Sequence, residues 1–315
     1  MKAIILENAG GADKLISTEL PIPTLKLGEV LIKVRSISIN PVDIKTRNGK
    51  ALYNSLIGSG NIILGWDIAG DIVETLGDTG SFKIGDAVFG MINFPNEGKA
   101  YAEFVAAPAS DLCLKPVMLS YDDAAAASLA ALTAWQSLIH IAKIQKGETI
   151  LIHAAAGGVG HFAVQIAKHI GAKVIGTASV SNHAFLKSLG ADEVLDYSES
   201  NIFENYKETV DVVLDPIGGN TTKISYSMLK ANGRLVSIVG GVKEEDNLLR
   251  ESKNIVAENY LVKTSGKDLL EIVKLIQQGH LKVFVSHVFP FNKIAEAHLQ
   301  IESNKTKGKV VINVK

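Results

Sequence analysis

A short glycine-rich turn carries the clearest chemical signature in the chain. Its sequence, HAAAGGVGHF, lies between an apolar run at 150–153 and a segment with helical spacing. The spacing is that of a G-x-G-x-x-G fingerprint with alanine first. This pattern permits a tight turn, close approach of the backbone to a pyrophosphate, and close packing of a helix on a strand. A helix starting near Gly158 would point free N–H groups and its positive dipole end at the phosphates. We therefore expect a dinucleotide site at Ala155, Gly157, Gly158, Val159 and Gly160; the alternative is a plain tight turn.

The end of the next predicted strand indicates which dinucleotide binds. A site for NAD usually places Asp or Glu there, to bind the ribose 2′-hydroxyl. From His161 to Ala191 the chain has no acidic residue. A 2′-phosphate needs hydroxyl, amide or cationic donors, and a carboxylate would repel it. The sequence therefore favours NADP(H), bound at Ser179, Asn182 and His183. The alternative is a solvated helix start with Ser179 as its cap.

The pattern around the turn predicts the elements that position it. Strand patterns recur at 149–154, 172–178, 192–197, 210–217 and 233–240, with helical patterns between them, notably at 184–189 and 221–229. This alternation predicts βαβ units and a parallel sheet. Residues 1 to about 115 are instead rich in strand patterns. Ser120 followed by Asp123 marks a helix N-terminus between the two regions.

Length and composition exclude several classes of protein. A chain of 315 residues is expected to split into two domains. The formal net charge of -1 gives no bulk attraction to nucleic acid or to an anionic membrane. No window approaches the ~20 consecutive apolar residues of a membrane span. The only cysteine is Cys113, so no internal disulfide is possible, and we expect a cytoplasmic protein.

Motifs along nearly the whole chain resemble one family. In order they read NPVDIKTRNG, GWDIAGDIV, FKIGDAVFGM, AALTAWQSL, AAAGGVGHFAVQIAK, LGADEVLDY, DVVLDPIGG, GRLVSIVGG and GKVVINV. This order resembles the zinc-free quinone oxidoreductase and enone reductase branch of the medium-chain dehydrogenase/reductase superfamily. The resemblance implies an α/β chain, with a GroES-like, β-rich catalytic domain of residues 1–122 and 266–315. It also implies a doubly wound Rossmann domain of residues 123–265 with a parallel sheet.

The resemblance further implies an activity and an assembly. The activity is NADPH-dependent reduction of a small-molecule quinone or α,β-unsaturated carbonyl, such as an alkenal or enone. The assembly is a homodimer formed through the edge strand of the Rossmann sheet, near residues 255–262.

Comparison with the zinc-containing relatives raises the question whether this chain binds a catalytic zinc. A catalytic zinc needs three Cys, His or carboxylate ligands and an open position. Where those relatives have their first cysteine ligand, this chain has Asn40. Where they have Gly-His-Glu, it has Gly65-Trp66-Asp67. The four-cysteine structural lobe is also missing, since Cys113 stands alone. The sequence therefore predicts no metal site.

Without a metal, side-chain donors must stabilise the negative charge that hydride transfer creates on a carbonyl oxygen, while the cofactor supplies the difficult chemistry. The resemblance places the segment SINPVDIK at the nicotinamide. There Asn40 would hold the cofactor ribose or donate to the substrate, Lys45 would donate to the enolate, and Asp43 would orient it. The alternatives are a turn at Asn40, a helix cap at Asp43 and a solvated Lys45.

Lys45 at the end of this segment and Tyr53 beyond it bear on the substrate. Many quinone reductases of the branch have tyrosine where Lys45 stands, and a lysine there favours the alkenal and enone reductases. Tyr53 is expected to line the pocket, or else to pack in a loop.

Further cofactor contacts follow from the resemblance and from the sheet edge. Thr133 would contact the nicotinamide end, and Tyr197 the adenosine phosphate. Val239, Gly240 and Gly241 close a strand at the carboxyl edge of the sheet, where ligands bind in doubly wound folds. The alternatives are an ordinary helical threonine, a packing aromatic and a plain turn.

Two rival functions remain open. An enoyl-thioester reductase would need a basic groove for its carrier, and the only basic cluster is NKTKGK at 304–309. A non-catalytic NADPH-binding redox sensor would bind the cofactor without oxidising it in the presence of acceptors.

Overall fold

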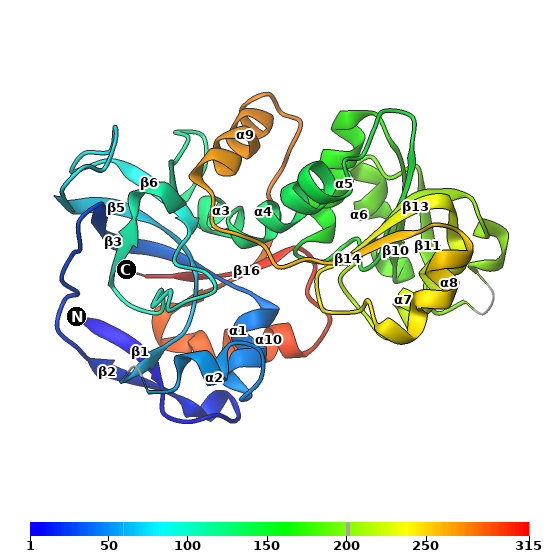
Figure 1. Cartoon of the computed structure of the whole chain (residues 1–315). Helices are drawn as coiled ribbons and strands as arrows, with labels where there is room; N and C mark the ends of the chain where they lie inside the picture. The colour runs from blue at the N-terminus through cyan, green and yellow to red at the C-terminus, as the bar shows by residue number, and fades with distance from the viewer. Residues whose placement is uncertain (59, 200–201, 315) are drawn as a thin grey trace. The chain divides into compact units, whose positions relative to one another are not determined.

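The computed structural model describes residues 1–58, 60–199 and 202–314, which form two compact units. Unit 1 comprises Met1–Leu132, Lys263–Gln277 and Val283–Lys315, and unit 2 comprises Thr133–Val262 and Gln278–Lys282. Both ends of the chain contribute to unit 1, as the blue and red segments of Figure 1 show. The chain enters unit 2 ten residues later than the boundary at 122/123 expected from the sequence.

Unit 1 is built mainly of antiparallel strands. A small sheet has the order β2-β1-β4, and a larger one has the order β15-β16-β3-β5-β6-β8, with β7 also paired to β3. Only the pair β15 and β16 is parallel within the larger sheet. The strands of unit 1 in the described residues are β1 (Lys2–Leu6), β2 (Leu15–Glu19), β3 (Glu29–Ile39), β4 (Ile62–Ile63), β5 (Asp67–Leu76), β6 (Ala87–Met91), β7 (Phe104–Pro108), β8 (Leu112–Leu114), β15 (Val285–Pro290) and β16 (Lys309–Asn313).

Strand β3 is the central strand of unit 1. It pairs with β5 along one edge, and its other edge is shared between β7 at 29–33 and β16 at 36–39. Its sequence EVLIKVRSISI is dense in β-branched residues, which suit a pleated and buried surface. Most of its residues are buried, and the strand delivers Asn40 at its carboxyl end.

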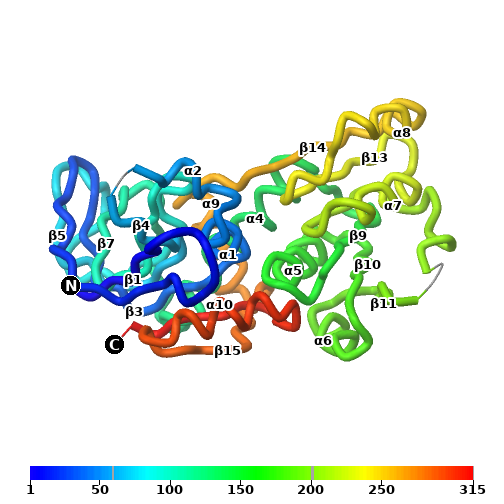
Figure 2. The backbone as a smooth tube through the Cα atoms, turned by 90° about the horizontal axis from the view of Figure 1, so that it is seen from below, coloured from blue at the N-terminus to red at the C-terminus, as the bar shows by residue number. Residues whose placement is uncertain are grey.

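The helices of unit 1 cover this sheet and carry the segment that follows β3. They are α1 (Pro41–Arg47), α2 (Tyr53–Leu56), α3 (Tyr121–Ala126), α9 (Gly266–Gln277) and α10 (Ile294–Glu302), while α4 (Leu129–Trp135) crosses into unit 2. The predicted start at Ser120 is confirmed, because its hydroxyl accepts a hydrogen bond from the Asp123 N–H at 3.0 Å. Helix α10 packs on β16 and on α1, beside the N-terminal loop, as Figure 2 shows.

Unit 2 contains one parallel sheet with the strand order β11-β10-β9-β12-β13-β14. The order reverses between β9 and β12, so the sheet is doubly wound and the predicted α/β class is confirmed. Its strands are β9 (Thr149–Ile152), β10 (Lys173–Ala178), β11 (Glu193–Asp196), β12 (Val210–Asp215), β13 (Leu229–Ser237) and β14 (Val256–Asn259).

The helices of unit 2 pack on successive strands. They are α5 (Gly160–Ile170), α6 (His183–Ser188), α7 (Asn220–Met228) and α8 (Asn247–Ser252), and a π-helical segment, Gln136–Ile141, extends α4. Helix α5 packs on β9 and β10, α6 on β11, and α7 on β12 and β13. Strands β9, β10 and β12 are buried almost throughout, as expected for a parallel sheet covered by helices. No helix in the described ranges is both long and apolar enough to cross a membrane.

Candidate active site

The predicted dinucleotide turn connects β9 to α5 in unit 2. Ala154 adopts a left-handed conformation with φ of 45°, which is unusual for a residue with a Cβ atom. Two hydrogen bonds to Thr177 hold it there: the Ala154 N–H donates to the Thr177 hydroxyl at 3.2 Å and the Ala155 N–H to the Thr177 carbonyl at 3.0 Å. The turn is thereby fixed to the end of β10.

A buried histidine supports the turn from within the sheet, and the sequence reasoning did not find this role. His153 lies within 3.3 Å of the Thr177 hydroxyl through Nδ1 and within 2.9 Å of the Ser225 hydroxyl through Nε2. Because the Ser225 hydroxyl donates to the Thr221 carbonyl at 2.7 Å, it must accept from Nε2, so Nε2 carries the ring proton and Nδ1 accepts from Thr177. Burial lowers the pKa of His153 to about 4, so the ring is neutral and this arrangement is stable near pH 7.

Two of the three glycines in the turn, Gly157 and Gly160, have different surroundings. A Cβ atom on Gly160 would lie 2.5 Å from the Ala154 carbonyl oxygen and 2.6 Å from the Ala155 Cα, so the backbone of this chain already excludes it. A Cβ on Gly157 would meet only the Ala154 oxygen, at 3.2 Å, a tight contact that a small backbone shift relieves. The fold therefore requires a glycine less strictly at Gly157 than at Gly160, and a glycine at Gly157 suits a backbone that must approach a phosphate. Gly158 and Val159 complete the turn and are half-buried.

The residues expected to select the 2′-phosphate lie together at the end of β10. The Ser179 hydroxyl is 3.1 Å from that of Ser181 and accepts a hydrogen bond from the Asn182 amide at 3.1 Å. This cluster of hydroxyl and amide groups follows the strand next to the glycine turn. His183 begins α6 directly after it.

The structure adds one carboxylate that the search of residues 161–191 did not include. Asp196 ends β11 and pairs in register with Ala178. A hydrogen bond from the Ser198 N–H is the main reason why the pKa of Asp196 lies below its ordinary value, and His183 contributes to the same shift. Tyr197 follows it and is largely exposed. A carboxylate is thus present at the end of β11, the strand beside β10, whose end is the predicted 2′-phosphate site.

The other predicted cofactor residues of unit 2 lie at two places. Val239, Gly240 and Gly241 follow β13, where the Gly241 N–H donates to the Ser237 hydroxyl at 2.9 Å. Beside them at the end of β12, the Asp215 carboxylate accepts from the N–H groups of residues 217 and 218. Asp215 therefore shapes a turn. Thr133 is buried in α4.

The predicted catalytic segment of unit 1 forms the short helix α1. The Asn40 N–H donates to the Asp43 carboxylate at 2.6 Å, and Pro41 occupies the first helical position. Asp43 is therefore a cap for this helix, the alternative considered from the sequence. The buried face of α1 includes Asp43 and Arg47, whereas Lys45 is exposed.

The polar atoms of Asn40 are all engaged inside unit 1. Its amide nitrogen donates to Asp67 Oδ2 at 2.8 Å and to the Ser38 carbonyl at 3.4 Å, and its oxygen accepts from Lys309 Nζ at 2.5 Å. Lys309 also donates to the Ile39 carbonyl and lies 3.8 Å from Asp67 Oδ2. The amide has two N–H donors, and both are used. Asn40 is only 1% exposed.

Burial dominates the electrostatics of this cluster. It raises the pKa of Asp43 to about 8 and that of Asp67 to about 6, and it lowers the pKa of Lys309. At neutral pH Asp43 is therefore mostly protonated. The remaining pair, Asp67 and Lys309, carries opposite charges.

Lys45 and Tyr53 are the predicted residues of unit 1 that are accessible to a ligand. Tyr53 begins α2, is half-buried, and accepts a hydrogen bond from the Ala9 N–H at 3.3 Å through its hydroxyl. It lines a pocket of about 330 Å³ together with residues of β1 and with Ile57.

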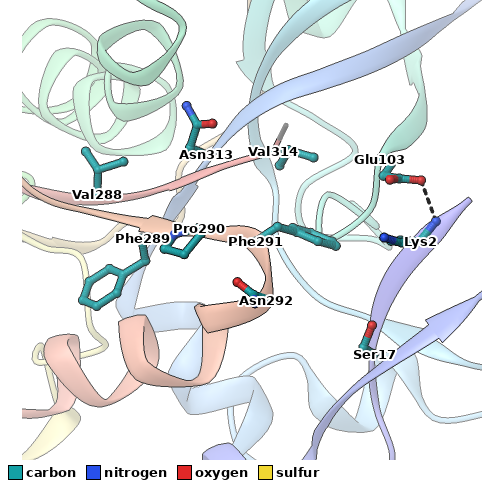
Figure 3. Close-up of a pocket in the computed structure, with 10 residues that line it drawn as sticks. All are labelled: Lys2, Ser17, Glu103, Val288, Phe289, Pro290, Phe291, Asn292, Asn313 and Val314. Carbon is teal, nitrogen blue, oxygen red and sulfur yellow. Dashed lines mark hydrogen bonds between the residues drawn. The ribbon is translucent and has the colours of Figure 1, made fainter.

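A larger cavity of about 700 Å³ lies elsewhere in unit 1. Figure 3 shows Phe291 and the end of β15 on one side and Lys2 on the other, where the Lys2 N–H donates to the Glu103 carboxylate. None of the site residues expected from the sequence lines this cavity.

The residues at the ligand positions of zinc-containing relatives do not fit a zinc site. The Asn40 amide and the Asp67 carboxylate bind each other, and the second Asp67 oxygen accepts from the Leu129 N–H at 2.8 Å. The Trp66 indole has no lone pair for a metal and donates to the Asn96 carbonyl at 2.7 Å. Within the described ranges, no group of three or more His, Cys, Asp or Glu side chains could hold a metal ion.

The contrast between the two glycines gives a prediction. Gly160→Ala should lower the free energy of unfolding by about 1–3 kcal/mol, because its methyl group overlaps the backbone. Gly157→Ala, whose methyl group meets one backbone oxygen at 3.2 Å, should be destabilised less than Gly160→Ala and should bind NADPH at least about tenfold more weakly, a loss of ~1.4 kcal/mol. Urea denaturation and fluorescence titration with NADPH measure both effects. Wild-type NADPH affinity in Gly157→Ala would show that the phosphates bind elsewhere.

The buried carboxyl of Asp43 gives a second prediction. Between pH ~4 and ~8 the folded state holds a proton on Asp43 that the unfolded state releases, so stability falls as the pH rises, by at most about 1.4 kcal/mol per pH unit. Asp43→Asn has no titrating carboxyl at this position and therefore lacks this pH-dependent loss of stability. Its stability relative to the wild type should therefore increase from pH 5 to pH 8 in urea denaturation. The exposed Asp78→Asn is the control, and parallel curves for Asp43→Asn and wild type would contradict the prediction.

Comparison with known proteins supplies the family context. The family model "Alcohol dehydrogenase GroES-like domain" matches residues 26–143, and "Zinc-binding dehydrogenase" matches residues 189–312. A chloroplastic NADPH-dependent alkenal/one oxidoreductase of Arabidopsis thaliana is 32% identical over 99% of this chain and 79% of its own length.

Several solved structures cover the entire chain, and two of them show the likeness. A quinone oxidoreductase from Coxiella burnetii superposes with a TM-score of 0.94 at 35% identity, covering 100% of this chain and 99% of the other. The CurK enoyl reductase superposes with a TM-score of 0.90 at 30% identity, with the same coverage. Together with the doubly wound unit 2 and the β-rich unit 1, these matches show that the chain belongs to the quinone oxidoreductase and enone reductase branch of the medium-chain dehydrogenase/reductase superfamily.

Proposed function

We propose that this protein is an NADPH-dependent oxidoreductase that transfers a hydride to an activated alkene, such as an alkenal or enone, or to a quinone, without a metal. The observation that carries the proposal is the pairing of two features. Unit 2 has a glycine-rich turn between β9 and α5, in which the fold requires Gly157 less strictly than Gly160. Unit 1 has an exposed cation, Lys45, on a helix whose other face is buried. The names of the alkenal/one and quinone oxidoreductase relatives support the same reaction.

The cofactor proposal rests on the chemistry of unit 2. The turn residues 155–160 would hold the pyrophosphate, and the hydroxyl and amide groups of Ser179 and Asn182 would donate to the 2′-phosphate, with His183 beside them. Thr133, Tyr197 and residues 239–241 stay assigned to the remaining cofactor contacts. When bound, NADPH supplies the hydride. Asp196 opposes this selection, so the preference for NADPH over NADH has to come from the Ser179 cluster.

The donor roles in unit 1 differ from residue to residue. The Lys45 ammonium is exposed and has no hydrogen-bond or ion-pair partner among the described residues, and it is proposed to donate to the oxygen that becomes negative. Tyr53, which lines the smaller pocket, is proposed to contact the substrate. Asn40 and Asp43 are proposed to hold the helix that carries Lys45, because their polar groups are engaged within unit 1.

The proposal also covers the roles of the two units, the oligomeric state and the location of the protein in the cell. Unit 1 is proposed as the catalytic domain and unit 2 as the nucleotide-binding domain. A homodimer is proposed through β14, an edge strand on which Val256 is 63% exposed, and through the following Leu261, which is 54% exposed. A reducing cytosol suits a chain whose only cysteine is buried.

An acceptor panel tests the function. Oxidation of NADPH and NADH is measured with an alkenal, a cyclic enone and 1,4-benzoquinone, with and without a chelator. We expect alkene-dependent oxidation of NADPH, with kcat/KM at least about tenfold above that for NADH, and no effect of the chelator. Tight NADPH binding with no oxidation by any acceptor would support the redox-sensor alternative, and inhibition by the chelator would contradict the metal-free reaction.

Lys45 provides the sharper test of the chemistry. Lys45→Ala should reduce kcat/KM for the enone about tenfold to hundredfold, because it removes a charged donor to the forming oxyanion. NADPH affinity should not change. Lys50→Ala, an exposed lysine three residues after the helix, is the control and should keep full activity. Equal activities of the two variants would rule out the oxyanion role.

An enoyl-thioester reductase is the second candidate, favoured by the likeness to the CurK enoyl reductase. A crotonyl thioester added to the acceptor panel distinguishes the two. A kcat/KM for the thioester well above that for the free enone would make the thioester reductase the better assignment.

A further inference from the structure

A series of buried polar side chains in contact with one another connects helix α1 to Tyr101 and to His298 of helix α10. Arg47 Nη1 lies 3.4 Å from His298 Nδ1, and His298 Nε2 lies 2.9 Å from the Tyr101 hydroxyl. Tyr101 is also close enough to the Asp43 carboxyl to affect the pKa of that group, and Asp43 Oδ1 is buried with no hydrogen-bond partner. All four residues are at most 1% exposed. Arg47 and Asp43 both belong to α1, so this series of side chains begins and ends on the same helix.

The chemistry of the groups fixes the direction of these hydrogen bonds. Arginine can only donate, so His298 Nδ1 must accept and the ring proton must sit on Nε2. Nε2 then donates to the Tyr101 oxygen, which directs the Tyr101 proton to Asp43. Burial, with the charge of Arg47 as a smaller cause, lowers the pKa of His298 to about 3, so the ring stays neutral. Burial also raises the pKa of Tyr101 well above its ordinary value.

The same arginine is fixed from a second side. Its Nε donates to the Gly10 carbonyl at 3.0 Å and its Nη2 to the Glu302 carboxylate at 2.5 Å. His298 and Glu302 lie on α10, which packs against α1 and the N-terminal loop, as seen in Figure 2. Helix α1 is therefore held at its first turn by Asp43 and at its last residue by Arg47. Lys45 lies between these two points on the exposed face.

We propose that Tyr101 and His298 are positioning residues for the reaction: through Asp43 and Arg47 they fix the orientation of α1 and thereby of the Lys45 side chain. The inference deepens the proposed function and depends on it. Neither residue touches substrate or cofactor in this role. Their contribution is geometric, and a small displacement of a donor can reduce turnover as much as about hundredfold.

Tyr101→Phe is the first test, because it removes only the hydroxyl. With an enone acceptor, kcat should fall about tenfold to hundredfold, while the acceptor KM and the NADPH affinity stay within about twofold of the wild type. The variant also loses a donor that lowers the pKa of Asp43. The pH-dependent decrease of stability should therefore extend to higher pH than in the wild type. The other charged groups that act on Asp43, Asp67 from β5 and Lys309 from β16, are unchanged.

A matched pair at position 298 separates the hydrogen bonds from packing. The amide of His298→Gln reaches the place of Nε2 and can donate to Tyr101. The amide of His298→Asn reaches only the place of Nδ1 and can accept from Arg47. If the connection to Tyr101 and Asp43 positions α1, His298→Gln keeps a kcat at least about fivefold above that of His298→Asn, a difference of ~1 kcal/mol. Thermal unfolding shows which variants are folded under the assay conditions.

The outcomes distinguish the inference from the proposed function. Wild-type kcat and wild-type pH dependence of stability in Tyr101→Phe overturn the inference, and so do equal activities of the two variants at position 298. The proposed function stands in that case, because wild-type enone reduction is unaffected. If the wild type reduces no acceptor, the proposed function fails. The pH dependence of unfolding in Tyr101→Phe then still reports whether Tyr101 acts on Asp43.

Discussion

Unit 1 is organised around one buried positive charge, the ammonium group of Lys309. It lies where β3, β5 and β16 meet, in contact with Ile39 and Asn40 and near Asp67. An ammonium removed from water is costly unless it is paired and hydrogen-bonded. Here the same contacts that compensate the charge also fix both ends of the Asn40 amide. Helix α1 starts at the next residue, so the position of Lys45 depends on a charge that is buried inside unit 1.

The residues that the resemblance sets at the ligand positions of zinc-containing relatives have protein partners in unit 1. Asn40 and Asp67 bind each other. Trp66, which precedes Asp67, is buried and donates to a backbone carbonyl. Asn40 accepts from the Lys309 ammonium, and Asp67 lies 3.8 Å from it. These contacts connect the ends of β3 and β5, which pair at this point.

The features that sequence could predict are those whose physical cause is local. The glycine turn is one, because the need for Gly160 arises from atoms of Ala154 and Ala155 only a few residues away. The Ser120 cap is another. The roles of His153, Tyr101 and His298 depend on partners that only the tertiary structure supplies: His298 is 197 residues from Tyr101 in sequence. Asp196 could not be found from the sequence for a related reason. Strand pairing brings it beside the end of β10, although it lies outside the segment that follows β10 in the chain.

The participation of both chain ends in unit 1 has a consequence for synthesis on the ribosome. Most of unit 2 is one continuous stretch, 133–262, that can fold as it emerges, whereas β3 emerges early and its partner β16 last. Until then β7 covers only residues 29–33 of one β3 edge, and residues 36–39 present unpaired backbone next to apolar side chains. Such an edge can pair with other chains. The nascent protein therefore carries an open strand edge and an uncompensated Asp67 until its final strand docks, and this is the stage at which protection by a chaperone would matter most.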